Sequence, residues 1–133
     1  MAVAGWIVDK SAAARSVDPA VARQLQELAG ALWICPIGQL EQLYSARSAV
    51  EYDAWDEQIR SGYRVAEAPA DVLERALLLQ RDLAHHHGMW HRVAIPDLLI
   101  AETALERGLG VLHVDAEFDR IAEVRPLVAR RLG

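Results

Sequence analysis

Four acidic residues of this sequence stand where apolar runs end or where helices are expected to begin, and together they could bind a divalent metal ion. They are Asp9, Glu41, Asp97 and Asp115. Oxygen ligands without an accompanying His or Cys pattern suit Mg²⁺ best, with Mn²⁺ as an alternative. An ion held in this way can activate a water molecule and stabilise charge on a leaving oxygen. The cluster therefore favours hydrolysis or transfer at a phosphodiester or phosphoryl group.

Asp97 occupies the most informative of these positions, in the first turn of an expected helix. Pro96 suits the start of that helix, and Gly108 supplies its end. Asp97 shares a helix face with Ala101 and Ala104, and we expect this small, apolar face to pack closely against buried structure. A first-turn Asp is also favoured by the helix dipole, by less than about 1 kcal/mol, so the position alone leaves a capping role open.

Glu41 falls within an apolar stripe of another expected helix. Ile37, Leu40 and Tyr44 form this stripe in the helix predicted over residues 37–46. A lone glutamate on a helix is usually solvated, but one on the buried face needs a partner, because burying an unpaired carboxylate is unfavourable. Glu41 is therefore a second candidate for a shared ion.

Apolar runs alternate with helical patterns along the chain. Strands are expected at Gly5–Val8, Ala31–Cys35, Tyr63–Val65 and Leu109–Val114, with a last edge strand within Val124–Arg130. Helices are expected at 12–15 with Ser11 as N-cap, from Asp18-Pro19 to Gly30, and at 37–46, 50–61, 70–83, 96–107 and 116–122. This alternation predicts an α/β fold with three layers, α/β/α, around a central, mainly parallel sheet of four to five strands.

The expected sheet explains how acids that are distant in the sequence can meet. Right-handed crossovers put the carboxyl ends of parallel strands on one edge, where such sheets bind ligands. All four acids can converge there. Their mutual repulsion would then raise their pKa values or separate them, unless a cation is present.

Composition limits the class of protein. A length of 133 residues fits one domain, and no apolar run approaches the roughly 20 residues of a membrane span. Met1–Val8 lacks the basic region of a signal peptide, so a cytoplasmic protein without membrane contact is expected. The net charge of −5 argues against a broad electrostatic nucleic-acid binder. An enzyme whose acids are neutralised by a metal remains compatible with that charge.

The segment from His85 to Arg92 is rich in histidine. A zinc site on a continuous helix is disfavoured because Gly88 interrupts the histidines and the metalloprotease glutamate is missing. We expect a polar loop beside the site, with His91 and Arg92 available to contact phosphates and Arg15 as a further substrate-binding candidate. Alternatively, the histidines favour a helix C-terminus through the dipole.

The segments that carry these acids resemble a PIN-domain ribonuclease of the VapC toxin type. They are Ile7–Ala12, Pro36 with Glu41–Leu43, Ile95–Ala104 and Leu112–Phe118. The third is the most specific, and the resemblance covers essentially the whole chain in order. It implies that residues 1–133 form a single PIN domain.

By position, the resemblance implies that Asp9, Glu41, Asp97 and Asp115 are the metal-binding and catalytic acids. Ser11 matches a small hydroxyl residue that steadies the first Asp or a water molecule. Glu117 stands where many relatives have a second Asp in an Asp-x-Asp-Phe pattern, and is assigned a supporting role.

The resemblance also implies a function. The chain is expected to be a Mg²⁺-dependent endoribonuclease that leaves a 5′-phosphate and a 3′-hydroxyl. It is expected to act as a toxin on RNA, to be inhibited by a cognate antitoxin protein, and to form a homodimer.

Other functions remain open at this point. One is a catalytically silent PIN-fold module that binds protein. Another is a phosphotransferase with an aspartyl phosphate at Asp9, although haloacid-dehalogenase-like enzymes need Asp-x-Asp where this chain has Asp9-Lys10-Ser11. DNA could replace RNA as substrate, since the acids do not read a 2′-hydroxyl. Cys35, the one cysteine, lies in an apolar run and is expected to be a small buried hydrophobe rather than a nucleophile.

Overall fold

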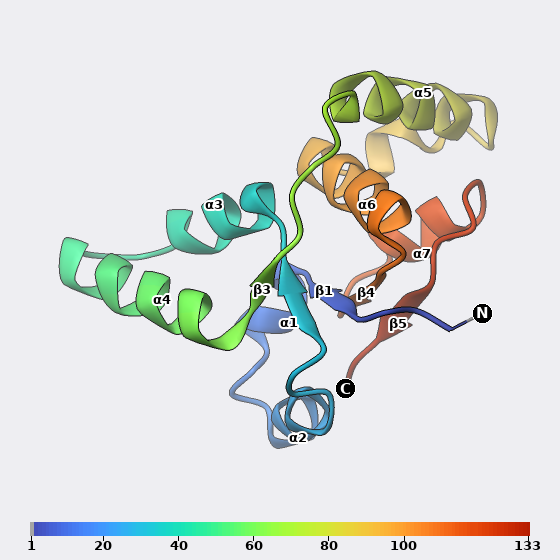
Figure 1. Cartoon of the computed structure of the whole chain (residues 1–133). Coiled ribbons are helices and arrows are strands. Elements are labelled where there is room, and N and C mark those ends of the chain that lie inside the picture. Colours follow the sequence, from blue (N-terminus) through green and yellow to red (C-terminus); the bar gives the residue numbers. More distant parts are fainter. Residues whose placement is uncertain (1) are drawn as a thin grey trace.

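A parallel five-stranded sheet forms the centre of the protein, described here by a computed structural model for residues 2–133 (Figure 1). Its strands are β1 (Trp6–Val8), β2 (Leu32–Ile34), β3 (Arg64–Val65), β4 (Gly110–His113) and β5 (Ala129–Arg131), in the order β3-β2-β1-β4-β5. All four pairings are parallel. The last strand lies at an edge, as expected, but it begins only at Ala129, after Pro126.

Helices cover both faces of this sheet. They are α1 (Lys10–Ala14), α2 (Pro19–Glu27), α3 (Pro36–Tyr44), α4 (Ala49–Gly62), α5 (Val72–His85), the 3₁₀ helix η1 (Met89–Arg92), α6 (Ile95–Arg107) and α7 (Glu117–Ala122). Ile7 and Val111 face the core beneath α5, α6 and α7. The next residues along the strands, Val8 and Leu112, face α1 and α2. This arrangement confirms the predicted α/β/α fold.

Local sequence signals set several helix ends as expected. The Asp18 side chain caps α2 by accepting a hydrogen bond from Ala20 N at 2.9 Å. Gly108 ends α6 in the left-handed conformation, with φ of 67°. The N-cap of α1, however, is Asp9 and not Ser11. The Asp9 carboxylate accepts a hydrogen bond from the Ser11 backbone N–H. Asp9 takes this position because it is the single residue between the end of β1 at Val8 and the start of α1 at Lys10.

Helix α3 buries a different face from the one predicted. Leu40 and Tyr44 are 63% and 91% exposed, whereas Gly38 and Leu43 are buried. Leu43 packs with Ile34 in a small core beneath α4, and α3 and α4 extend together to one side of the sheet in Figure 1. Ile37 packs against the main core as predicted, but the prediction was wrong for Leu40 and Tyr44, because α3 packs against α4 and α6 at once.

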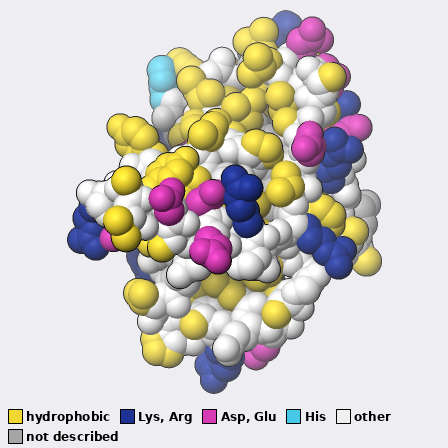
Figure 2. All heavy atoms as spheres, turned by 60° about the vertical axis from the view of Figure 1, so that its left-hand side comes forward, with side chains coloured by type: hydrophobic (Ala, Val, Ile, Leu, Met, Phe, Trp, Pro, Cys, Tyr) yellow, Lys and Arg dark blue, Asp and Glu magenta, His cyan; other side chains and the backbone are white. Residues whose placement is uncertain are grey.

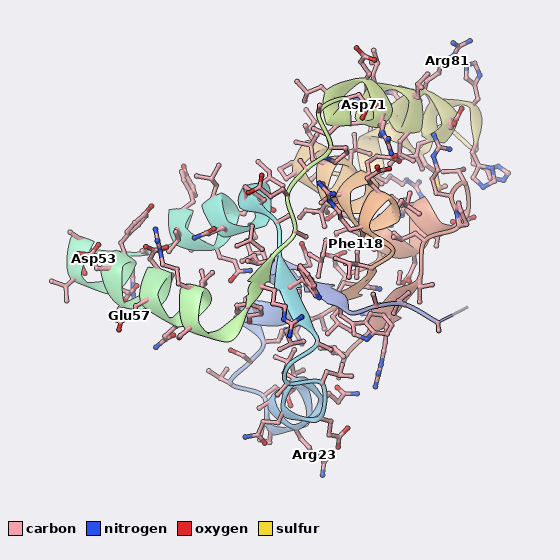
Figure 3. All side chains as sticks on the ribbon, viewed as in Figure 1. Arg23, Asp53, Glu57, Asp71, Arg81 and Phe118 are labelled. Atoms are coloured by element: carbon pink, nitrogen blue, oxygen red, sulfur yellow. The ribbon has the colours of Figure 1, made fainter. Side chains whose placement is uncertain are left out.

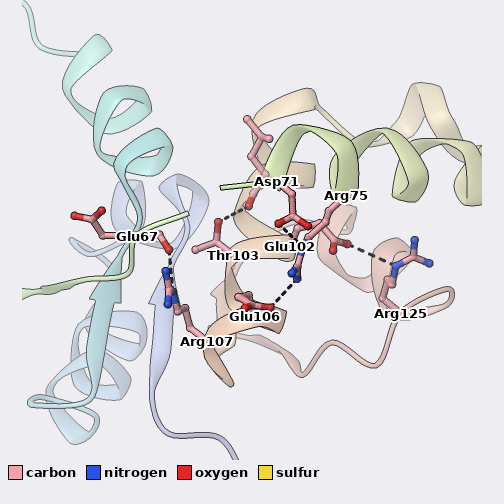
Figure 4. Close-up of polar contacts among 9 residues, drawn as sticks. Glu67, Asp71, Arg75, Glu102, Thr103, Glu106, Arg107 and Arg125 are labelled. Atoms are coloured by element: carbon pink, nitrogen blue, oxygen red, sulfur yellow. Dashed lines mark hydrogen bonds and ion pairs between the residues drawn. The ribbon is translucent and has the colours of Figure 1, made fainter. Parts of the chain in front are cut away.

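A network of ion pairs joins α5, α6 and the C-terminal segment (Figure 4). Arg75 on α5 contacts Asp71 at 2.9 Å and Glu106 on α6 at 2.7 Å. Arg125 contacts Asp82 on α5 at 2.7 Å and the buried Glu102 on α6 at 3.6 Å. These contacts hold the middle and the C-terminal part of α6, whereas Asp97 lies at its N-terminus. Among residues 2–133, no helix is both long and apolar enough to cross a membrane.

The close packing of Trp6 on Gly110 gives a first prediction. A Cβ atom at Gly110 would lie 2.6 Å from Trp6 Cζ3 and 2.9 Å from the Val128 carbonyl oxygen. Gly110→Ala should therefore lower the free energy of unfolding by about 1–3 kcal/mol through overpacking. Urea denaturation measures this change. The matched control is Gly62→Ala, whose added Cβ meets no heavy atom within 4 Å. Equal loss in both variants would contradict the packing argument.

Candidate functional site

Five carboxylates gather at the carboxyl edge of the central strands. Asp9 follows β1, Glu41 lies in α3, and Asp97 lies in the first turn of α6. Ligand atoms of these three acids all lie within 4.8 Å of one another. Ligand atoms of Asp97, Asp115 and Glu117 form a second group with the same limit. The structure thus brings together all four acids predicted as ligands and adds Glu117, with Asp97 common to both groups.

Asp9 is held in place by Ser11. The Asp9 carboxylate accepts hydrogen bonds from Ser11 N at 3.0 Å and from Ser11 Oγ at 2.7 Å. Ser11 Oγ in turn accepts from Val114 N at 3.0 Å, so this residue ties the end of β1 to the end of β4. Burial raises the pKa of Asp9 above its ordinary value, and the charge of Asp115 adds to the rise.

Asp97 has the most perturbed environment in the cluster. Its side chain is 5% exposed, and burial followed by the charge of Asp9 raises its pKa to about 9. Glu117 and Glu41 add to the rise. Glu117 is positioned by a 2.7 Å hydrogen bond that its Oε1 accepts from the backbone N–H of Ala94, the N-cap of α6. Without a cation, Asp97 therefore holds a proton at neutral pH.

Glu41 presents a buried oxygen to the same site. Its Oε1 is inaccessible to solvent and has no hydrogen-bond partner in residues 2–133. Burial and the charge of Asp9 raise the pKa of Glu41, while Lys10 lowers it. Lys10 is thus a cation near the cluster that the sequence analysis did not identify. Its position directly after Asp9 is the only sequence signal for that role.

Cys35 is buried at the N-cap of α3, near this site, and burial raises its pKa to about 11. Its thiol is therefore protonated at neutral pH, which agrees with the prediction of a buried hydrophobe rather than a nucleophile.

The predicted substrate-binding residues lie on exposed segments. Arg15 caps the end of α1, while His91 and Arg92 belong to η1. Within residues 2–133, no hydrogen bond or ion pair joins their side chains to the acids, and Arg120 Nη1 donates to the Arg92 carbonyl at 3.0 Å. Substrate binding by these three residues therefore stays a prediction.

The histidine segment does not form a metal site in the described part of the chain. In residues 2–133, the two groups of side chains that could hold an ion consist of carboxylates and include no histidine. His86 Nε2 instead lies 3.3 Å from Glu123 Oε1 on the segment after α7.

Fold and site together define a class of protein, a parallel α/β protein whose sheet edge carries clustered carboxylates. The family model of the PIN domain matches residues 6–124. Ribonuclease VapC17 of Mycobacterium tuberculosis is 53% identical over 124 residues, which cover 91% of this chain and 90% of that protein. Ribonuclease VapC18 of the same organism is 40% identical over 122 residues, covering 90% and 88%. The chain belongs to the PIN-domain family and, within it, to the VapC ribonucleases, which confirms the resemblance.

Solved structures agree on the fold. A DNA-bound VapBC2 complex from Rickettsia felis contains a chain with a TM-score of 0.77 and 16% identity, covering 95% of this chain and 97% of that one. A DNA-bound VapBC complex from Salmonella typhimurium gives a TM-score of 0.77 at 19% identity, covering 96% and 97%.

The raised pKa of Asp97 predicts how stability depends on pH. Between the ordinary value of 3.8 and about 9, the folded chain keeps a proton that the unfolded chain releases. In chelator, the free energy of unfolding should therefore fall as pH rises through this window. Asp97→Asn should weaken that fall and stabilise the protein at mildly alkaline pH. Thermal melts at several pH values measure the effect.

Asp53, on α4 (Figure 3), belongs to neither acid group and supplies the control. Asp53→Asn should keep the wild-type pH dependence. A wild-type stability that rises with pH across the window would contradict the environment described for Asp97.

Proposed function

We propose that this chain is a metal-dependent endoribonuclease that acts as the toxin of a toxin–antitoxin pair, with residues 1–133 forming one PIN domain. The observation that carries the proposal is the convergence on Asp97 of acids from the end of β1, from α3 and from the segment between β4 and α7, in a chain that belongs to the VapC ribonucleases. Asp9, Glu41, Asp97 and Asp115 are the proposed catalytic and metal-binding residues. Ser11 and Glu117 support them.

The donor set fits a hard divalent cation, Mg²⁺ or alternatively Mn²⁺. All donors are carboxylate oxygens, and the buried Glu41 Oε1 has no hydrogen bond in residues 2–133. Asp9, Glu41 and Asp97 would hold one ion. Asp97, Asp115 and Glu117 offer a second position, so Asp97 would be shared if two ions bind.

The residues around the cluster suit hydrolysis of RNA by water. When bound, the ion supplies positive charge that lowers the pKa of water and offsets charge on the phosphate. Glu41 would orient the attacking water and accept its proton, because one of its carboxylate oxygens lies within 4.8 Å of ligand atoms of Asp9 and Asp97. Ser11 keeps Asp9 in place through two hydrogen bonds. The products would carry a 5′-phosphate and a 3′-hydroxyl.

Substrate binding would depend on local cations, because the net charge of −5 repels nucleic acid. Arg15, His91 and Arg92 are the proposed contacts to RNA phosphates, and all three are exposed. Lys10 adds positive charge beside Glu41.

The proposed protein partners are a cognate antitoxin and a second copy of the chain. Two structural neighbours are titled as VapBC complexes bound to DNA. Large apolar side chains are exposed on Leu40 and Tyr44 of α3 and on Leu73, Leu77 and Leu78 of α5. Figure 2 shows hydrophobic side chains at the surface on the face that carries α3 and α4. Such surfaces commonly bind other proteins, and we propose that the complex acts in the cytoplasm.

Cleavage of RNA by the purified, antitoxin-free protein tests the activity. We expect cleavage with Mg²⁺ or Mn²⁺, no cleavage with chelator, and products with 5′-phosphate ends. Asp97→Asn should reduce cleavage to the level of the chelated wild type, because Asp97 is common to both acid groups. End mapping of total RNA measures both results.

Asp53→Asn should cut RNA like the wild type and serves as the control for loss of one surface charge. Full metal-dependent cleavage by Asp97→Asn would remove this residue from the mechanism. An inactive wild type that binds its antitoxin would favour the silent module, and trapping by beryllofluoride would favour an aspartyl phosphate.

The role of Glu41 can be separated from metal binding. Glu41→Gln keeps one side-chain oxygen and removes the basic group, so cleavage should fall by about 10²–10⁴-fold, as for loss of a general base. Mn²⁺ binding, measured by calorimetry, should weaken far less than cleavage. Equal loss of metal binding and cleavage would show that Glu41 acts only as a ligand.

A further inference from the structure

The segment from His113 to Asp119 carries two of the five clustered acids. It leaves β4 at His113, passes Asp115, and enters α7 at Glu117. Three hydrogen bonds fix its first part. Val114 N donates to Ser11 Oγ at 3.0 Å, Glu117 N donates to Asp115 Oδ1 at 2.9 Å, and Ala94 N donates to Glu117 Oε1 at 2.7 Å.

His113 is an ionisable side chain that the proposed mechanism does not use. It is 0% exposed, and its ring packs against Phe118 of α7 at 5.7 Å between centroids. Neither ring nitrogen makes a hydrogen bond within residues 2–133. The Nε2 atom lies 3.3 Å from Oδ1 of Asp119, at ion-pair distance but outside hydrogen-bond geometry.

The two side chains differ in how far they are exposed to solvent. The His113 ring is enclosed, whereas the Asp119 side chain is 51% exposed and free to turn. A buried N–H group without an acceptor is unfavourable, so the nearby carboxylate is the group that can satisfy it. Oδ1 of Asp119, 3.3 Å from Nε2, is the side-chain acceptor at ion-pair distance from this ring in residues 2–133.

We propose that His113 and Asp119 form a positioning pair that closes the segment carrying Asp115 and Glu117. His113 precedes Asp115 by two residues, and Asp119 follows Glu117 by two residues. A contact between them therefore fixes both ends of the turn from which these acids project. Neither residue belongs to a group able to hold an ion in residues 2–133, so the pair acts through its neighbours.

This inference rests on the proposed metal-dependent function and makes it more specific. The pair keeps Asp115 and Glu117 at ligand distance from Asp97. Loss of a hydrogen-bonding partner that orients metal ligands commonly weakens metal affinity by about 10–100-fold. Asp9, Glu41 and Asp97 lie on other elements, and the hydrogen bond from Val114 N to Ser11 Oγ does not involve the pair, so the fold and ion binding by these three acids should persist without it.

The test measures Mn²⁺ binding by calorimetry and RNA cleavage as a function of Mn²⁺ concentration. Asp119→Ala should raise the Mn²⁺ concentration for half-maximal cleavage about 10-fold, with cleavage recovering at high Mn²⁺. Asp119→Asn keeps an acceptor oxygen and should restore most of the affinity. With a chelator present, Asp119→Ala should stay folded, with a melting temperature lowered only by the loss of one acceptor beside the buried His113 ring.

The matched control is Glu123→Ala, which removes an exposed acid at the end of α7 that contacts His86 and not His113. It should leave the Mn²⁺ dependence unchanged. His113→Phe fills the same apolar space without a donor, and its effect should not add to that of Asp119→Ala. Additive effects would mean that the two residues act separately.

Two failures can be told apart. A wild type without Mn²⁺ binding or cleavage overturns the proposed function and this inference together. A wild type that binds Mn²⁺ and cleaves RNA, with Asp119→Ala unchanged or Asp119→Asn as weak as Asp119→Ala, overturns the positioning pair alone.

Discussion

The mutual repulsion of carboxylates at one buried edge is the constraint on which the rest of this structure depends. Asp97 lies within ligand distance of two acids on one side and two on the other. Burial weakens the solvation that would normally stabilise such charges, which explains the rise of its pKa to about 9. Either protons or cations must neutralise part of this charge, and the surrounding elements hold the acids together regardless of which does so.

Helix α6 shows how differently one element can treat two buried acids. Glu102, near its centre, lies 3.6 Å from Arg125, whose charge counters the rise in the pKa of Glu102 caused by burial. Asp97, at its N-terminus, has only acids among the groups that shift its pKa. The ion pairs of Figure 4 therefore stabilise the far part of the helix, while Asp97, at the end by the sheet edge, has no basic partner in residues 2–133. That contrast separates a structural acid from a candidate ligand.

The sequence predicted most of the fold and the four main acids, because apolar alternation and helix-capping residues are local signals. Asp97 was identifiable from Pro96, Gly108 and the small face at Ala101. Glu41 was predicted from an apolar stripe of which Ile37 faces the core, whereas Leu40 and Tyr44 face solvent. Tertiary packing on α4 decided that rotation, and no local pattern reports it. The effect of the Lys10 charge on the pKa of Glu41, and the contact of His113 with Asp119, also depend on how α3 and α7 dock on the sheet.

Protons and cations compete for the same site in this arrangement. Burial raises the pKa values of Asp9, Glu41 and Asp97, and within residues 2–133 only Lys10, a cation near Glu41, opposes one of these shifts. A cation that binds must displace the proton held by Asp97, so the apparent affinity for the cation should increase as pH rises. A cation that binds the folded chain but not the unfolded chain also stabilises the fold. The clustered acids therefore destabilise the metal-free protein and stabilise the protein with its cation bound. The proposed activity and the stability thus depend on the same clustered carboxylates, at the N-terminus of α6 beside the sheet edge.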